Sequence, residues 1–194
     1  MRVTAGILRG RLIKAPKGDE VRPTQDMVRQ AVFSSLADRI PGASFLDLFA
    51  GTGAVGLEAW SRGAARIDWV EEGAKVFSVL QSNLEALCGG ASGKTVDQEW
   101  KATRSDVFRF IEGLRGIQSY DVIFADPPYD RLGTDRWAMK LLNVLAIGGL
   151  VAEGGVFVME QARDEVEASH FSWEIMASKV YGGTRVTIYR KTRK

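Results

Sequence analysis

The sequence of 194 residues is poor in side chains that form disulfides or bind transition metals, with one cysteine, Cys88, and one histidine, His170. A single cysteine excludes an internal disulfide and a zinc site built from several cysteines. His170 lies in a polar stretch far from the motifs described below, so we expect a surface role for it. We therefore expect no metal centre.

Long apolar runs are absent as well. No stretch approaches the roughly 20 apolar residues that span a bilayer, and the N-terminus lacks an apolar segment of the secretory type. The composition, 45% hydrophobic and 26% charged, is that of a globular protein long enough for one well-buried core. We expect a cytoplasmic protein without membrane association, and nothing in the sequence requires more than a monomer.

The net charge of +2 is distributed unevenly along the chain. Residues 1–40 carry eight basic and four acidic side chains, and residues 179–194 carry six basic side chains and no acidic one. The stretch between them is therefore acidic. Basic ends indicate either solvated tails or a surface that faces a polyanion. In both segments basic residues alternate with apolar ones in strand-like patterns, which favours the polyanion-facing surface.

The pattern of apolar residues divides the chain into a basic extension, residues 1–40, and a larger domain, residues 41–194. The extension reads as a β-hairpin followed by a helix that Thr24 caps. The domain alternates short apolar runs with helical segments and ends in a hairpin with a turn at residues 182–183. This order predicts an α/β fold with a mainly parallel, doubly wound sheet and an antiparallel C-terminal hairpin. The expected strands are 3–8, 11–15, 45–49, 66–70, 102–105, 121–125, 156–160, 172–180 and 185–191, and the expected helices are 25–38, 53–62, 74–87, 105–114 and 135–146.

A glycine-rich loop, residues 51–56 (GTGAVG), joins an expected strand to an expected helix. This G-x-G-x-x-G spacing suits an anion at a helix N-terminus and also occurs in dinucleotide-binding proteins. Asp47 precedes the loop, where its carboxylate would repel a pyrophosphate but can hold the ammonium group of a methionine. Glu71, or its neighbour Glu72, ends the next strand and can accept ribose hydroxyls. The combination predicts S-adenosylmethionine as the cofactor.

The turn around these glycines is wider than the compact turn of dehydrogenases. The expected cofactor loop comprises Phe49, Ala50, Gly51, Thr52 and Gly53. Asp106 follows the next strand and has two compatible roles, as an acceptor for the adenine amine and as the cap of the helix that it opens.

The tetrapeptide Asp126-Pro127-Pro128-Tyr129 directly follows the apolar strand 122–125. Two prolines keep this loop rigid at the carboxyl edge of the sheet, where such folds bind ligands. An amine conjugated to a purine is a poor nucleophile because its lone pair is delocalised. The Asp126 carboxylate and the Pro127 carbonyl can accept hydrogen bonds from the two N–H groups of the amine and so draw the lone pair back to nitrogen. Tyr129 can stack on the ring. The four residues are therefore the expected catalytic group for methyl transfer to an exocyclic amine.

Further motifs lie outside these two loops. They are Gly6, Arg9-Gly10-Arg11, Arg22-Pro23-Thr24, Arg29 with Phe33, the extended stretch 47–59, and Tyr181-Gly182. With these motifs the chain resembles, over nearly its whole length, the bacterial 16S ribosomal RNA guanine-N2 methyltransferases. The Arg-Gly-Arg and Arg-Pro-Thr motifs are the most specific part of the resemblance.

The resemblance implies a Rossmann-like S-adenosylmethionine-dependent methyltransferase fold and transfer to the N2 amine of one guanine in 16S rRNA. The substrate would be the 30S subunit or an assembly intermediate. By position, Arg9, Arg11, Arg22, Thr24 and Arg29 would contact the RNA. Arginine contacts to phosphates add affinity with little sequence information, and an unpaired guanine entering the pocket would supply specificity.

Other functions remain compatible with parts of the sequence. An adenine-N6 DNA or RNA methyltransferase, or a protein glutamine methyltransferase, could use the same loops, although the sequence has no large insertion for DNA target recognition. A dinucleotide oxidoreductase is disfavoured by Asp47 and has no use for residues 126–129. A non-catalytic RNA-binding module would have lost a motif residue, and none is missing.

Overall fold

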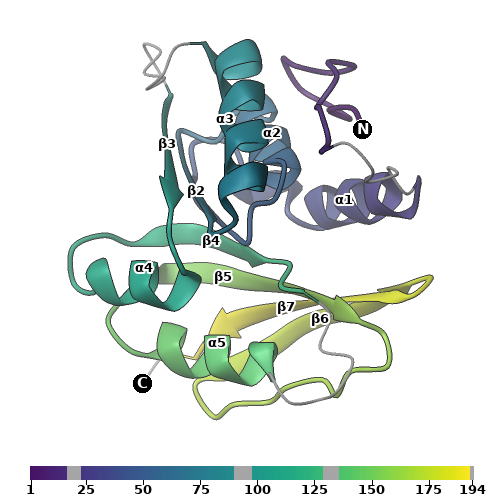
Figure 1. Ribbon diagram of the computed structural model, residues 1–194. Coiled ribbons are helices and arrows are strands. Elements are labelled where there is room, and N and C mark those ends of the chain that lie inside the picture. Colours follow the sequence, from purple (N-terminus) through teal and green to yellow (C-terminus); the bar gives the residue numbers. More distant parts are fainter. Residues whose placement is uncertain (17–22, 90–97, 129–135, 193–194) are drawn as a thin grey trace.

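The computed structural model describes residues 1–16, 23–89, 98–128 and 136–192, and the side chains of residues 23–25 lie outside that description. Within these ranges one sheet of seven strands has helices on both sides (Figure 1). The strands are β1 (Ser44–Leu48), β2 (Arg66–Glu71), β3 (Glu99–Arg104), β4 (Tyr120–Ala125), β5 (Val151–Ala162), β6 (Trp173–Tyr181) and β7 (Thr184–Lys191). The helices are α1 (Pro23–Ser35), α2 (Ala54–Ser61), α3 (Ala74–Cys88), α4 (Val107–Gly113) and α5 (Trp137–Ala146), with a 3₁₀ turn at Ala37–Arg39.

The strand order is β3-β2-β1-β4-β5-β7-β6. Strands β1 to β5 pair in parallel, and β7 pairs antiparallel with both β5 and β6. The central strands form near-continuous apolar runs because helices cover both of their faces. The predicted α/β fold, with a mainly parallel sheet and an antiparallel C-terminal hairpin, is confirmed.

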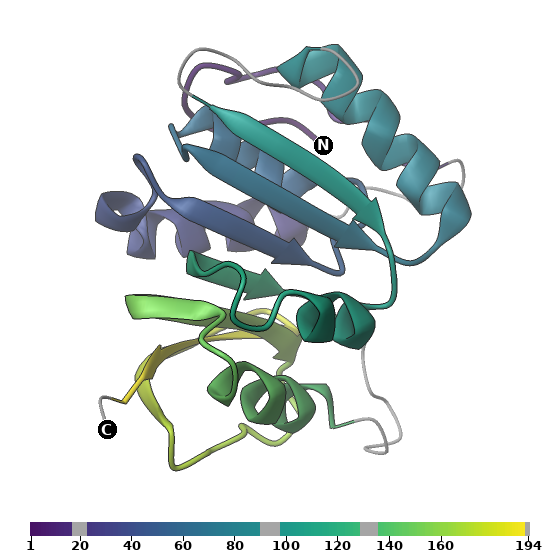
Figure 2. The ribbon, with the colours of Figure 1, turned by 90° about the vertical axis from the view of Figure 1, so that its left-hand side faces the viewer.

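Alternating residues of each central strand enter two different cores. On β4, Val122 and Phe124 join the cluster that includes residues of α1, α2 and α3, whereas Ile123 and Ala125 join the cluster with α4 and α5. This period of two is the ordinary consequence of strand geometry. The two groups of helices are separated in the turned view as well (Figure 2). None of the helices in the described ranges is long and apolar enough to cross a membrane.

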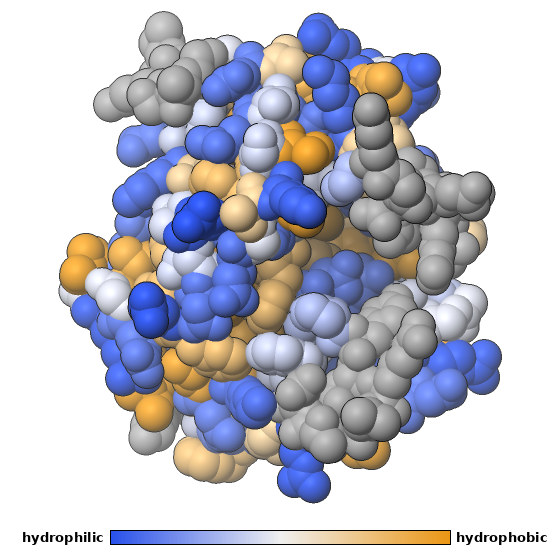
Figure 3. Space-filling view, in the orientation of Figure 1, coloured by the Kyte–Doolittle hydropathy of each residue, from blue (hydrophilic) through white to orange (hydrophobic). Residues whose placement is uncertain are grey.

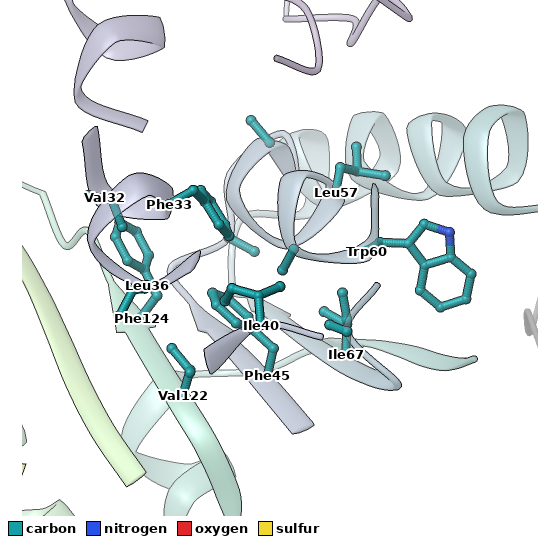
Figure 4. Packing of buried hydrophobic residues seen from close by; sticks show 14 of the residues in the cluster. Val32, Phe33, Leu36, Ile40, Phe45, Leu57, Trp60, Ile67, Val122 and Phe124 are labelled. Atoms are coloured by element: carbon teal, nitrogen blue, oxygen red, sulfur yellow. The ribbon is translucent and has the colours of Figure 1, made fainter. Parts of the chain in front are cut away.

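The first forty residues share the core of the larger domain. Val32 and Phe33 of α1, and Leu36 directly after it, point toward strands β1 and β4 (Figure 4), and the rings of Phe33 and Phe45 stack 6.2 Å apart. Val3, Leu8 and Ile13 of the N-terminal segment belong to the same cluster. The extension is therefore packed onto the sheet through one continuous apolar interior.

The predicted N-terminal β-hairpin is replaced by a compact loop. Within residues 1–16 only an isolated bridge joins Arg2 to Leu12, and no strand forms. Three backbone hydrogen bonds accompany this bridge, among them Val3 N to the Arg11 carbonyl at 3.1 Å. Beyond the bridge the amides bond to side chains of α2: Thr4 N donates to Glu58 at 2.8 Å and Leu8 N donates to Ser61 at 2.9 Å. Side-chain acceptors on a helix compete here with the ladder that the alternating sequence pattern predicted.

Candidate active site

The candidate site lies at the carboxyl edge of the sheet, where the chain leaves β1, β2 and β4. Strand β1 sits between β2 and β4, so the connections that follow these strands run in opposite directions along the sheet. Ligands in open α/β sheets bind outside the carboxyl ends of the strands at such a switch point. The molecular surface in Figure 3 is hollowed near its centre, where apolar surface lies deeper than the hydrophilic residues around it.

The glycine loop after β1 is held close to β2. Gly53 has a φ of +83°, and a Cβ placed there would lie 2.4 Å from Leu80 Cδ1. A Cβ on Gly56 would lie 2.2 Å from Trp69 Nε1. These approaches exclude any larger side chain without displacement of the neighbours, so the two glycines allow α2 to begin directly against the sheet. Phe49 has a φ of +59°, a strained conformation for a residue other than glycine.

Asp47 lies beneath this loop and is 2% exposed. Its Oδ2 accepts a hydrogen bond from Gly56 N at 2.9 Å, so one carboxylate oxygen already joins β1 to the first turn of α2. Burial raises the pKa of Asp47 well above its ordinary value, the Gly56 amide opposes that rise, and the charges of Asp126 and Glu71 add to it. The structure thus brings together the three carboxylates that the sequence assigned to cofactor and substrate.

Glu71, at the end of β2, faces the glycine loop, whereas Glu72 is exposed. The Glu71 carboxylate accepts from Gly51 N at 2.9 Å and from Gly73 N at 2.7 Å. These bonds connect the loops that follow β1 and β2. Of the two alternatives left by the sequence, Glu71 is therefore the one in position to reach a ligand seated on the glycine loop.

Asp106 follows β3 and opens helix α4. Its side chain accepts from Arg109 N at 2.9 Å, which confirms the expected role as a helix cap. The residue is exposed at the same edge of the sheet, so one role does not preclude the other.

Asp126 is the first residue after β4 and is half-buried, with Pro127 buried and Pro128 exposed. Tyr129 lies outside the described residues. Burial raises the pKa of Asp126 to about 7. Within the described ranges no hydrogen bond or ion pair reaches its carboxylate, so this half-buried group is open to a ligand.

Glu160 is a second half-buried carboxylate at this edge, and the sequence pattern assigned no role to it. It follows the buried run 156–159 of β5, the strand next to β4. Burial, and then the negative charge of Asp126, raise the pKa of Glu160 to about 8. The sequence did carry one signal for Glu160: it is a carboxylate at the end of an apolar strand, as Asp126 is.

Three aromatic rings form an apolar wall beside the glycine loop. The ring of Trp137 stacks on Phe108 at 6.0 Å and meets Phe49 edge-on at 5.4 Å. The buried Trp137 Nε1 has no hydrogen-bond partner within the described residues. The wall joins the loop after β1 to helices α4 and α5, next to Asp106.

The residues expected to contact RNA fall into different environments. Arg9 and Arg11 are exposed in the N-terminal loop. Arg22 lies outside the described residues, and Thr24 lies in the first turn of α1 with its side chain outside the description. Arg29 differs from the prediction. It is 5% exposed, and its guanidinium donates to Glu58 Oε2 at 3.4 Å and to the Arg2 carbonyl at 2.6 Å, so it is committed to the interior.

The described side chains fit a cationic adenosyl ligand. Asp47, Glu71, Asp126 and Glu160 concentrate negative charge at one edge, and no lysine or arginine forms an ion pair with any of them within the described ranges. A sulfonium and an ammonium group would relieve that repulsion. The glycine loop allows a ligand to approach the backbone closely, and the aromatic wall offers a face for a purine.

Comparison with known proteins places the chain in a family. Residues 1–190 match the family model described as "Conserved hypothetical protein 95". Ribosomal RNA small subunit methyltransferase D of Escherichia coli K12 is 30% identical over 192 residues, which cover 98% of this chain and 90% of that protein. YlbH of Bacillus subtilis is 32% identical over 200 residues, covering 98% of this chain and 99% of its own length.

Solved structures agree with these relatives. The structure of yhhF from Escherichia coli has a TM-score of 0.82 and 29% sequence identity, and the match covers 100% of this chain and 99% of that one. Similarity therefore extends over the N-terminal loop, the glycine loop and the C-terminal hairpin together. The chain belongs to the Conserved hypothetical protein 95 family and is a methyltransferase with a Rossmann-like fold.

Proposed function

We propose that this enzyme transfers a methyl group from S-adenosylmethionine to the exocyclic N2 amine of a guanine in 16S ribosomal RNA. The observation that carries the proposal is the Asp126 carboxylate. It is half-buried, has no partner among the described residues, and lies close enough to Asp47 beneath the glycine loop for its charge to raise the pKa of Asp47. The name of the relative from Escherichia coli, a small-subunit ribosomal RNA methyltransferase, supports the choice of RNA.

Residues at the carboxyl ends of β1, β2 and β3 would hold the cofactor. The backbone of residues 49–53 would lie against it, and Asp47 would keep that loop in place through Gly56. Glu71 would accept the ribose hydroxyls, and Asp106 the adenine amine. When bound, the cofactor supplies a methyl group activated by a sulfonium, which leaves as the thioether once the amine nitrogen has taken the methyl.

Asp126 and the Pro127 carbonyl would accept the two N–H groups of the target amine. This arrangement localises the nitrogen lone pair and directs it at the methyl group. Asp126 accepts most strongly as the anion, and positive charge on a neighbouring ligand lowers its pKa. The carboxylate therefore becomes a better acceptor when the cofactor is present. Tyr129 would stack on the base.

Arg9 and Arg11 would bind RNA phosphates from the exposed N-terminal loop. Arg22 and Thr24 remain predicted contacts, and the interior position of Arg29 supports a role in holding the loop instead. The substrate that we propose is the 30S subunit or an assembly intermediate, in which an unpaired guanine can enter the pocket.

The test is methyl transfer from labelled S-adenosylmethionine to 30S subunits isolated from a strain that lacks this protein. Nuclease digestion and mass spectrometry of the product should locate one N2-methylguanosine in 16S rRNA. Label in an adenine, in DNA or in a glutamine side chain would instead select one of the other amine methyltransferase functions.

A further inference from the structure

Glu160 stands beside Asp126 on the neighbouring strand. Strands β4 and β5 pair in parallel with Ala125 opposite Met159, so the next residues of the two strands, Asp126 and Glu160, are neighbours across the ladder. Adjacent strands lie about 4.8 Å apart. Two carboxyl groups at that spacing can reach two adjacent groups on the edge of one base.

Both side chains lie on the same face of the sheet. Phe124 of β4 and Val158 of β5 belong to the cluster with α1, α2 and α3, whereas Ala125 and Met159 belong to the opposite one. Strand alternation therefore returns Asp126 and Glu160 to the first face. The negative charge of Asp126 raises the pKa of Glu160, which agrees with this placement.

Nothing within the described residues compensates this pair. Glu160 is half-buried, and no described hydrogen bond or ion pair reaches its carboxyl group. A half-buried carboxyl group without a partner is costly to ionise, and such groups concentrate at functional sites. The raised pKa of Glu160 shows the same cost, which a hydrogen-bond donor on a ligand would offset.

We propose that Glu160 is a specificity-determining residue that accepts a hydrogen bond from N1–H of the guanine whose N2 amine Asp126 holds. The inference rests on the proposed function. Guanine presents N1–H and the N2 amine side by side on its Watson–Crick edge, and a carboxyl oxygen accepts from such donors whether the group is ionised or protonated. The positive charge of the bound cofactor favours the ionised form of Glu160, and against that form a purine with an acceptor at N1 places a lone pair.

Adenine is such a purine. Its N1 is an acceptor, so the Asp126 and Glu160 pair favours guanine over adenine without any contact to the far side of the base. Asp126 alone does not make this distinction, because it addresses only an exocyclic amine. The choice between the guanine-N2 and adenine-N6 reactions then depends on Glu160 of β5.

The test uses 2-aminopurine, which keeps the exocyclic amine at C2 but has an acceptor in place of N1–H. The guanine mapped by the preceding experiment is replaced by 2-aminopurine through ligation of synthetic RNA and reconstitution into 30S subunits. The measured quantity is the ratio of kcat/KM for guanine to kcat/KM for 2-aminopurine. The wild-type enzyme should favour guanine by roughly tenfold to a hundredfold, the discrimination expected of a good base-edge contact.

The variant Glu160→Gln should lower this ratio at least tenfold, because its amide N–H can donate to the N1 acceptor of 2-aminopurine. Glu160→Asp keeps an acceptor, so its preference for guanine should survive a slower rate. Glu153→Gln is the matched control, since Glu153 is exposed near the opposite end of β5. Unchanged affinity for S-adenosylmethionine by calorimetry shows that each variant is folded.

Three outcomes separate the two claims. Methylation of guanine with a ratio that Glu160→Gln leaves unchanged overturns the role of Glu160 and keeps the proposed function. A wild-type enzyme and a Glu160→Asp variant that both show no preference for guanine over 2-aminopurine would also overturn the role of Glu160 and keep the proposed function. This outcome can be read even if Glu160→Gln does not fold. Absence of guanine methylation by the wild type overturns both.

Discussion

Two regions of this protein place carboxylates away from water and treat them in opposite ways. Glu58 of α2 is 0% exposed and is surrounded by donors, because it accepts from Thr4 N, Thr4 Oγ1 and Ala5 N and pairs with Arg29 and Arg62. Asp126 and Glu160 have no such donors in the described part of the chain.

This difference indicates a structural role for Glu58 and a ligand-binding role for Asp126 and Glu160. Around Glu58 the charge is neutralised within the protein, and the result is a fixed N-terminal loop that presents Arg9 and Arg11. At the carboxyl edge of β4 and β5 the charge is left for a ligand to neutralise. Burial by itself therefore says little about the role of a carboxylate, and the presence of donors decides it.

Removing the Asp126 carboxylate should have the largest effect on activity. We expect Asp126→Ala to lower kcat by about 10²–10³-fold, the loss typical of one electrostatic contact in a transition state, while the affinity for S-adenosylmethionine changes little. Methyl transfer to 30S subunits and calorimetry of cofactor binding measure the two quantities. Activity close to that of the wild type would remove Asp126 from the mechanism.

Removing the Glu58 charge should have the largest effect on stability. Glu58→Gln removes the charge that Arg29 and Arg62 share and leaves Arg29 with the Asp26 carboxylate at 3.0 Å. We therefore expect a loss of about 3 kcal/mol in the free energy of unfolding by urea titration. Glu174→Gln is the matched control, because Glu174 pairs with Arg190 at 2.7 Å on the surface and should cost less than about 1 kcal/mol. Equal losses in the two variants would contradict the statement that Glu58 neutralises a buried charge.

The unpaired carboxylates should make the ligand-free protein less stable at high pH. Their pKa values in the folded state, about 7 for Asp126 and about 8 for Glu160, exceed the ordinary 3.8 and 4.5. A group whose folded pKa is raised contributes stability that is complete below pH 4 and is lost as the pH rises through about 7 to 8.

The double variant Asp126→Asn, Glu160→Gln has no such titration. Its free energy of unfolding relative to the wild type should therefore increase between pH 5 and pH 8.5, as measured by urea unfolding. A difference that stays constant over this range would show that neither carboxylate is costly in the folded state.

The smallest expected effect concerns the RNA-facing loop. Replacing both Arg9 and Arg11 with Ala should weaken binding to 30S subunits and reduce the slope of log K against log salt concentration by about 1 for each arginine. Arg29→Lys should change stability but leave this slope as in the wild type. A slope unaffected by the double replacement would contradict phosphate contact by the loop.

Much of the fold was predictable because it depends on local pattern. The alternation of apolar runs and helical segments predicted the parallel sheet, and the strands it indicated lie close to the observed ones, although β5 begins at Val151 instead of residue 156. The N-terminal loop was not predictable in this way. The alternating pattern predicted a hairpin, but the amides of Thr4 and Leu8 bond to Glu58 and Ser61 of α2, and no local pattern shows that competition.

The sequence by itself determined where the chemistry lies. Glycine at positions 53 and 56 permits a tight turn against the sheet, and the two prolines after Asp126 restrict the backbone. Their order in the chain therefore already indicates a cofactor loop and a rigid catalytic loop. Only the tertiary structure decided which charges remain available. Arg29 turned out to be paired with Asp26 and Glu58. Glu160 turned out to lie beside Asp126 with no ion pair in the described part of the chain. The reason is physical: whether a charge has a partner depends on neighbours from distant parts of the chain.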